Sequence, residues 1–372
     1  MQIKMILPYS DNLKIEYLSR IFDRNRISNC YKYFWFMSIL EKISETKTEF
    51  TYDELITEMV AIAWYTVNEY RLKLGPANTT DNLEEAVKYL HDEVFAGQVP
   101  STIKKEALRE LLFGLDDRKF KQYKNTLTNN VPYCLQSPFY GKDLKDPNKN
   151  KIEAINLEKR LIYYFKDYNS LKTEICVTDE WAEYLIRNRE ILMDWTRYNL
   201  IGYLQSRNPA VPGIADKIIP PYSRNLNRVK RYWDVIIDVD KGLKDIYGDN
   251  KLSDISISID HFIPWQYVAH DELWNLNPTT KNINSSKGNN LPNWDKYFGR
   301  LLELEYRAYT LRYENKRVEE AFNKCADYHL NNSEIRSSLY ADGLAKNDFG
   351  VRLENVIKPV YKSAINCGFR EW

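Results

Sequence analysis

Residues 255–292 read ISISIDHFIPWQYVAHDELWNLNPTTKNINSSKGNNLP, and their pattern differs from that of the surrounding chain. The first residues alternate isoleucine with a polar residue, at Ile255, Ile257 and Ile259. A period of two predicts a strand with one buried and one polar face. The strand ends at Asp260 and His261, in a segment that holds two of the four histidines of the 372-residue chain. We therefore expect polar side chains to gather where this strand ends.

The residue types in this segment suit metal-assisted chemistry. Asp260 offers a hard oxygen ligand, and Asn284 offers a neutral oxygen from a predicted helix. His261 can accept a proton near neutral pH. Lys287 follows Asn284 by about one helical turn. Because Mg²⁺ keeps several waters and takes substrate phosphate oxygens, so small a ligand set suits phosphodiester hydrolysis better than a structural metal.

The spacing of these residues resembles the HNH (ββα-metal) endonuclease motif. The similarity is to the variant in the HNH domain of CRISPR RNA-guided DNA nucleases and in stand-alone bacterial HNH defence and restriction nucleases. Asn275 follows His261 by fourteen residues, and Asn284 follows Asn275 by nine. The remaining motif positions are Pro264, Lys287, Asn290 and the pair Leu291-Pro292. The third HNH position is Asn284 instead of a histidine, and it still supplies an oxygen ligand.

The resemblance implies a strand-hairpin-strand-helix unit closed around one divalent ion. It makes Asp260 and Asn284 the metal ligands and His261 the base that activates water. It assigns Asn275 to bracing the hairpin and holding the His261 ring, and Lys287 to contacting or neutralising phosphate. The implied cofactor is Mg²⁺, with Mn²⁺ or another divalent ion as a substitute, stabilising the leaving 3′ oxygen. The products would carry 5′-phosphate and 3′-hydroxyl ends.

The rest of the chain predicts a mainly α-helical protein with a small α+β insert. Only 13 glycines and 14 prolines occur, which is typical of a helical protein more than of a disordered or all-β one. We expect four parts. They are a helical N-terminal domain for docking or sensing (1–205), a Pro-rich connector with a basic helix (206–250), the ββα-metal nuclease module (251–298) and a helical C-terminal region (299–372).

The first helix is expected to begin near Asn29. It carries the aromatic residues of 31–36, which we assign to the core in preference to base stacking. Residues 51–54, Thr-Tyr-Asp-Glu, match a capping box before a second helix. That helix should end before Gly75, because a proline follows it.

Further helices are expected after Pro100 and from an N-cap at Thr178 towards Tyr203. Between them, residues 126–150 contain several proline and glycine residues and predict loops. Beyond residue 294 the apolar residues again recur at helical spacing, so a C-terminal helix is expected.

A basic helix is expected at residues 222–233, which contain no acid before Asp234. Its cations are Arg224, Arg228, Lys230 and Arg231. They could face a phosphate backbone, and a solvated helix face is the alternative. The formal net charge of the chain is only +1, so any affinity for nucleic acid must come from such a local patch.

The composition argues for a cytoplasmic protein with no membrane partner. The densest apolar runs are shorter than a membrane span, and the apolar N-terminal stretch is too short for a signal peptide. The five cysteines are far apart in sequence, which is typical of reduced thiols and argues against a zinc knuckle. His270 is expected in the loop between the strands and is assigned no role, while His91 and His329 are expected at the surface or in packing.

Three functions remain open from the sequence. The first is an endonuclease that hydrolyses double-stranded DNA in anti-phage defence or restriction. The second is an RNA-cleaving or partner-activated HNH effector subunit. The third is a degenerate HNH fold that only binds nucleic acid or protein, although the intact Asp260, His261 and Asn284 argue against it. A protein partner or a homodimer is also possible. Because a single site cuts one strand at a time, a double-strand break would need a homodimer, a second nuclease or two successive nicks.

Overall fold

The computed structural model describes residues 6–23, 27–76, 78–140, 149–157, 161–166, 168–219 and 225–372. The chain divides into two compact units. Unit 1 comprises Met1–Pro209 and Lys217–Pro220, and unit 2 comprises Ala210–Asp216 and Pro221–Trp372. Helices dominate both units, and the strands of the described residues form one three-stranded and one two-stranded sheet. The prediction of a mainly α-helical fold with a small α+β insert is confirmed.

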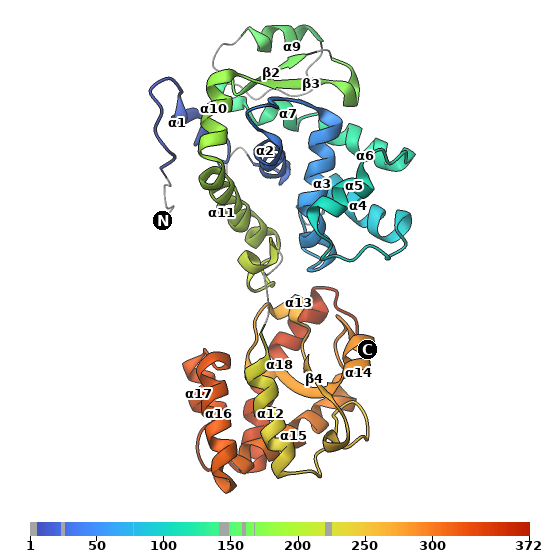
Figure 1. Ribbon diagram of the computed structural model, residues 1–372, viewed down its shortest axis with the longest axis vertical. Coiled ribbons are helices and arrows are strands. Elements are labelled where there is room, and N and C mark those ends of the chain that lie inside the picture. The colour runs from blue at the N-terminus through green and yellow to red at the C-terminus, as the bar shows by residue number, and fades with distance from the viewer. Residues whose placement is uncertain are drawn as a thin grey trace. The chain divides into compact units, whose positions relative to one another are not determined.

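Unit 1 is a helical assembly with a small antiparallel sheet against it (Figure 1). Its helices are α1 (Ile15–Leu18), α2 (Tyr31–Lys42), α3 (Tyr52–Asn68), α4 (Asn82–Tyr89), α5 (Lys105–Leu112), α6 (Arg118–Thr128), α7 (Val131–Cys134), α8 (Ser137–Tyr140), α9 (Lys149–Asn156), α10 (Asp179–Arg187) and α11 (Arg189–Arg207). The sheet has the order β1-β3-β2, with β1 (Glu49–Thr51), β2 (Tyr163–Lys166) and β3 (Glu174–Val177). The central strand β3 pairs antiparallel with both neighbours.

Two local sequence signals near the beginning of unit 1 correctly predict the start of α3 and the buried residues of α2. The Thr51 side chain accepts the backbone N–H of Glu54, and the Glu54 carboxylate accepts the N–H of Thr51. The predicted capping box is therefore confirmed, because both orphan amides of the first turn of α3 have partners. The predicted core role of residues 31–36 is also confirmed, since Trp35 and Phe36 are fully buried.

Two predictions for unit 1 were inaccurate. The helix expected from Thr178 to Tyr203 is two helices that meet at Asn188. The Asn188 backbone leaves the helical region, and its side-chain amide donates to the Tyr184 carbonyl at 2.9 Å. This local bond competes with continuation of the helix. Residues 126–150, expected to be loops, include α7 and α8, and residues 141–148 lie outside the described part.

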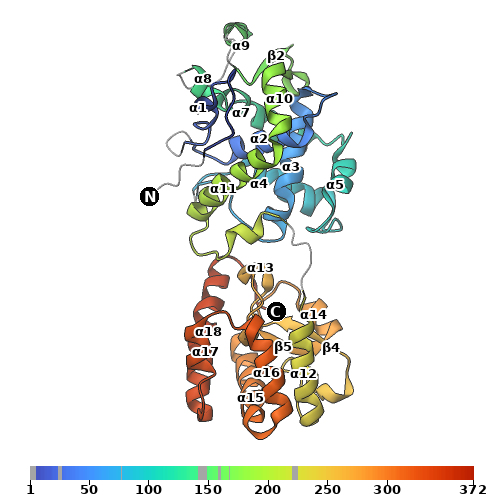
Figure 2. The same cartoon turned by 60° about the vertical axis from the view of Figure 1, so that its left-hand side comes forward.

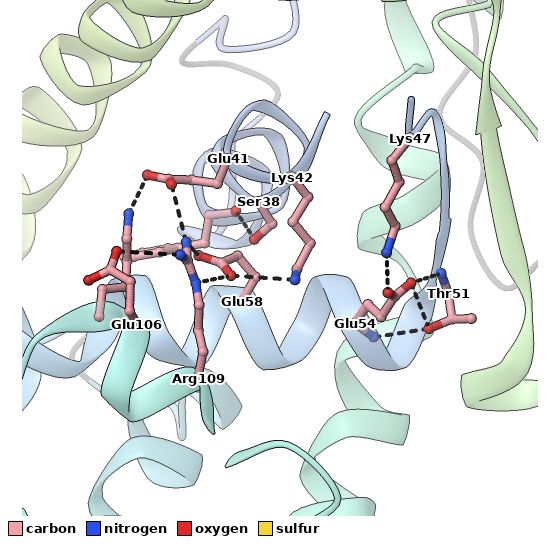
Figure 3. Close-up of polar contacts among 11 residues, drawn as sticks. Ser38, Glu41, Lys42, Lys47, Thr51, Glu54, Glu58, Glu106 and Arg109 are labelled. Atoms are coloured by element: carbon pink, nitrogen blue, oxygen red, sulfur yellow. Dashed lines mark hydrogen bonds and ion pairs between the residues drawn. The ribbon is translucent and has the colours of Figure 1, made fainter. Parts of the chain in front are cut away.

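An ion-pair network fastens α5 to α2 and α3 (Figure 3). The fully buried carboxylate of Glu58 on α3 accepts two bonds from the Arg109 guanidinium on α5, at 2.7 and 2.5 Å. Arg109 also donates to Glu41 on α2 at 3.2 Å. A buried carboxylate needs such partners, because removing one leaves an uncompensated charge. The network therefore holds three helices of unit 1 in one arrangement.

In unit 2, helices surround a β-hairpin and share one hydrophobic core with it. Figure 2 shows α12, α15 and α16 side by side. Its elements are α12 (Asn227–Val239), β4 (Ile257–His261), α13 (Trp265–Val268), β5 (Leu276–Thr280), α14 (Lys281–Lys287), α15 (Trp294–Glu314), α16 (Lys316–His329), α17 (Ser333–Leu339) and α18 (Lys346–Asn366). The predicted strand near residues 255–260 is β4, and it begins at Ile257. The expected alternation of buried apolar and exposed polar residues is wrong, because Ile259 is partly exposed and Asp260 is buried.

The sequence β4-β5-α14 is a ββα unit, and α12 is anchored to it. The indole N–H of Trp233 on α12 donates to the Leu276 carbonyl of β5 at 2.9 Å. The Thr280 side chain caps α14 by accepting the N–H of Ile283 at 3.1 Å. The helix ends at Gly288, whose φ of 51° is accessible to glycine at little cost. Across the described part of the chain, no helix combines the length and apolarity needed to cross a bilayer.

Candidate active site

The two strands of the hairpin bring the central residues together. In the antiparallel register Asp260 lies opposite Asn277, and His261 lies opposite Leu276. Directly opposed residues project from the same face of a sheet, so Asp260 and Asn277 share one face. Asp260 is 2 % exposed and His261 is 7 % exposed. The hairpin therefore holds a carboxylate and an imidazole at its end, both largely shielded from bulk water.

Asp260 is held by two donors from other elements. The Lys287 ammonium on α14 lies 3.0 Å from Asp260 Oδ1 and also donates to the His261 carbonyl at 2.9 Å. The Tyr247 hydroxyl donates to Asp260 Oδ2 at 2.5 Å. Lys287 and Asp260 are almost fully buried, so the ion pair is shielded from solvent screening. The carboxylate is thus fixed in orientation on both oxygens.

A second buried carboxyl group, that of Asp245, lies close enough to Asp260 to be affected by its charge. Asp245 accepts the Tyr247 N–H at 2.9 Å and the Thr279 hydroxyl at 2.7 Å. Burial raises the pKa of Asp245, and the charge of Asp260 adds to the increase. Burial also raises the pKa of Tyr247 well above its usual range, again with help from Asp260. Tyr247 is therefore a neutral hydrogen-bond donor at physiological pH and holds the Asp260 carboxylate in place.

Asn284 presents its side chain to the same strand. Its amide nitrogen donates to the Ser258 hydroxyl and to the Ile259 carbonyl, each at 3.0 Å. The amide oxygen accepts no hydrogen bond from the described residues. Since the nitrogen is held against β4, the oxygen is turned away from these two bonds and is available as an acceptor or ligand.

These oxygens fit a hard divalent cation. A carboxylate has about four lone-pair sites, so the two donors on Asp260 leave ligand capacity. Mg²⁺ is commonly bound by one or two protein oxygens and completes its shell with water and phosphate. Among the described residues, no group of three or more His, Cys, Asp or Glu side chains could hold a metal. Asp260 and the Asn284 oxygen remain the candidate ligands that the sequence predicts.

The His261 ring is oriented by the carboxylate of Asp271, which is not one of the motif positions. His261 Nε2 lies 2.8 Å from Asp271 Oδ1, in the loop between the strands. His329 at the end of α16 donates through Nδ1 to the Asp271 carbonyl at 2.7 Å. The neighbouring Glu272 carboxylate accepts bonds from the backbone N–H and the side-chain amide of Asn331, which follows α16. The end of α16 therefore fixes the loop that orients His261.

Asn275 braces the backbone after His261. It is fully buried, and its amide makes a matched pair of bonds with Ile263. The side-chain oxygen accepts the Ile263 N–H at 2.7 Å, and the side-chain nitrogen donates to the Ile263 carbonyl at 2.9 Å. The residue therefore closes the loop at the base of the hairpin, while the His261 ring itself contacts Asp271.

Lys287 and the basic residues lie in different environments. The sequence-based expectation was that Lys287 contacts or neutralises phosphate, yet its side chain is 1 % exposed and its ammonium is bonded to Asp260. Arg228, Lys230 and Arg231 are exposed on α12. Arg224 lies outside the described residues. The structure thus gathers Asp260, His261, Asn275, Asn284 and Lys287 at the hairpin, and it leaves the basic residues on a separate helix.

Three residues of the site were missed by reasoning from the sequence. Asp271 lies beside His270 in the inter-strand loop, Tyr247 lies in an earlier loop, and His329 ends a distant helix. Asp271 is ten residues from His261 and could have been considered as a second carboxylate in the segment. Tyr247 and His329 carry no spacing signal, because their contacts depend on how loops and helices pack around the hairpin.

Comparison with known proteins agrees with this geometry. A family model described as HNH endonuclease matches residues 245–293, which include the hairpin, α14 and the Tyr247 loop. No curated protein and no solved structure matches the chain. HNH endonucleases act on nucleic acids and generally use divalent metal ions. Residues 245–293 of this chain therefore form a domain of the HNH endonuclease type.

Proposed function

We propose that the protein is a Mg²⁺-dependent endonuclease that hydrolyses phosphodiester bonds of double-stranded DNA. The observation that carries the proposal is the bond between His261 and Asp271 beside Asp260. It supports His261 as an oriented general base, and Asp260 and Asn284 are the proposed oxygen ligands. The residues match the division of labour expected for metal-assisted hydrolysis, in which base and cation act on different oxygens.

Each side chain has a separate task in this proposal. His261 donates its Nε2–H to Asp271, and its imidazole would take the proton of the attacking water. Asp271 stabilises the imidazolium that forms. Asn275 holds the loop geometry through Ile263. Lys287 and Tyr247 orient the Asp260 carboxylate, and this role of Lys287 replaces the expected direct contact with phosphate.

Asp260 and the Asn284 oxygen would hold the metal ion. When bound, Mg²⁺, or Mn²⁺ in its place, supplies positive charge for the leaving 3′ oxygen. The oxygen of the attacking water forms the new bond to phosphorus, and the bond from phosphorus to the 3′ oxygen breaks. The water proton passes to His261, and the 3′ oxygen gains a proton from solvent. The products carry a 5′-phosphate and a 3′-hydroxyl.

DNA is the proposed substrate because the Asp-His-Asn-Asn-Lys spacing resembles that of DNA-cleaving HNH domains. The same resemblance supports a role in anti-phage defence or restriction in the cytoplasm. Unit 1 would dock a partner or sense a signal, and unit 2 would cut. A single site cuts one strand at a time, so a double-strand break requires a homodimer, a second nuclease or two successive nicks.

A cleavage assay with two substrates tests the proposal. Purified protein is incubated with supercoiled plasmid or with single-stranded RNA, with Mg²⁺ or with a chelator, beside His261→Ala. Metal-dependent plasmid cleavage that His261→Ala abolishes is the expected result. Cleavage of RNA with intact plasmid would instead indicate an RNA-cleaving effector. Binding without cleavage of either substrate would contradict the enzymatic proposal and favour a degenerate HNH fold.

A further inference from the structure

A basic groove runs between α12 and α16 in unit 2. It has a volume of about 550 Å³ and is lined by Arg228, Arg231, Tyr232, Val235, Arg317, Glu320, Ala321, Lys324 and Cys325. On α12 the lining residues fall at positions i, i+3, i+4 and i+7, and on α16 at i, i+3, i+4, i+7 and i+8, so each helix contributes one continuous stripe. Four of the lining side chains are cationic and one is acidic. The groove therefore has a net positive charge although the whole chain is nearly neutral.

The cations at one end of the groove have no acidic partners. Arg228, Arg231 and Lys324 are exposed and form no ion pair with any described residue. Two other arginines of unit 2 do have acidic partners. Arg317 at the opposite end of the groove lies 3.1 Å from Asp238, and Arg336 on α17 lies 3.7 Å from Asp327. The uncompensated charge is thus concentrated at the end formed by the start of α12 and the end of α16.

An aromatic ring shapes the same end. The Arg228 guanidinium lies 3.2 Å from the ring centroid of Tyr328, and Tyr328 is 56 % exposed. A guanidinium stacked on a ring keeps its N–H groups in the plane, where they can point to phosphate oxygens. The contact with Tyr328 therefore restricts the Arg228 side chain and preorganises its guanidinium as a hydrogen-bond donor.

This end of the groove is connected to the candidate active site. Tyr328 immediately precedes His329, which bonds to Asp271, and Asp271 bonds to His261. On the other side, Trp233 anchors α12 to the hairpin through the Leu276 carbonyl. The two helices that form this end of the groove, α12 and α16, are therefore bonded to the hairpin and to the loop that positions His261.

We propose that Arg228, Arg231 and Lys324 bind the phosphodiester backbone of duplex DNA on its way to His261. The inference rests on the proposed function and deepens it by naming a surface that positions the substrate. Backbone contacts by exposed cations carry no sequence information, so the groove sets register and affinity but not target choice. Each phosphate contact by a cation steepens the dependence of log affinity on log salt by about 0.9 for duplex DNA.

The test measures binding separately from cleavage. Fluorescence anisotropy of a labelled DNA duplex is followed against salt concentration, without divalent metal, in a His261→Ala background that cannot turn over. The variant Arg231→Gln/Lys324→Gln is compared with Arg336→Gln, which removes one cation of the same unit outside the groove. Thermal melting of each variant verifies that it is folded.

The groove variant should bind DNA more weakly than its parent. Its plot of log affinity against log salt concentration should have a slope that is shallower by close to two units, or about 0.9 per cation removed. The Arg336→Gln control should bind like its parent. Equal slopes for the groove variant and its parent would overturn the inference while leaving metal-dependent cleavage by the wild type untouched. Binding of RNA duplex alone would also overturn it. Failure of the wild type to cleave, with groove-dependent DNA binding retained, would count against the nuclease proposal only.

Discussion

His261 Nε2 lies 2.8 Å from Asp271 Oδ1 at the end of the hairpin. The bond matters because a carboxylate that accepts one N–H of a histidine fixes the tautomer and the orientation of the ring. Asp271 is in turn held through its backbone carbonyl by His329, which lies beyond the residues matched by the family model. Helix α16 is thus part of the support of the proposed active site.

Asp271→Asn should reduce turnover by about 10- to 100-fold, the usual cost of losing a carboxylate that orients a histidine. The acidic limb of the pH–rate profile should move to lower pH, because the imidazolium of His261 loses a neighbouring negative charge. Plasmid cleavage between pH 5 and 9 measures both effects. Asp254→Asn, an exposed carboxyl group in the same unit, is the control. A pH profile like that of the wild type would refute the positioning role.

Lys287→Met should destabilise the protein by about 3–5 kcal/mol, because it leaves the Asp260 carboxylate buried without its cation. The double variant Asp260→Asn/Lys287→Met should recover part of the loss, since no buried charge remains. Urea unfolding of both variants measures the free energy of unfolding. An unchanged midpoint for Lys287→Met would show that solvent reaches Asp260 freely, contrary to its burial.

Asn284→Ala should raise the Mg²⁺ concentration needed for half-maximal cleavage by about 10- to 100-fold, because it removes a proposed metal ligand. Loss of the two amide bonds to β4 should cost only about 1 kcal/mol in stability, so the fold should persist. Asn282→Ala, exposed on the same helix, should behave like the wild type. Metal titrations of the cleavage rate measure the effect, and wild-type rates at every Mg²⁺ concentration would exclude Asn284 as a ligand.

Glu305 predicts a pH-dependent stability for unit 2. Its side chain is buried in the core, and burial raises its pKa from 4.5 to about 8. Between these two pH values the folded state binds more protons than the unfolded state. Stability should therefore fall as the pH rises through this window, by about 1.4 kcal/mol per pH unit at most.

Glu305→Gln should remove this dependence, because glutamine does not titrate. Denaturant unfolding of the wild type and the variant at pH 5.5 and 7.5 provides the comparison. The wild type should lose stability relative to Glu305→Gln at the higher pH. Parallel changes in the two proteins would mean that Glu305 is already charged in the folded state.

Much of the local structure could be predicted from the sequence. The capping box at Thr51 and Glu54 needs only residues three apart, so its signal is visible in the chain itself. The Ile257–Ile259 alternation likewise identifies β4, because a strand places alternate residues on opposite faces. The break at Asn188 was missed, since its side-chain bond to Tyr184 competes with a helix that the apolar periodicity alone would continue.

For the site, the residue types and spacings from Asp260 to Lys287 were enough to predict the ββα unit, and they supply the ligand and base positions that are proposed for it. These residues lie within one hairpin and the following helix, where spacing along the chain determines position in space. The partners that orient them come from elsewhere. Tyr247 reaches Asp260 from a loop, and His329 reaches Asp271 from a helix that begins after residue 315. Those contacts, and the burial of Lys287, exist only because the apolar faces of distant helices pack around the hairpin, and linear spacing does not encode that packing.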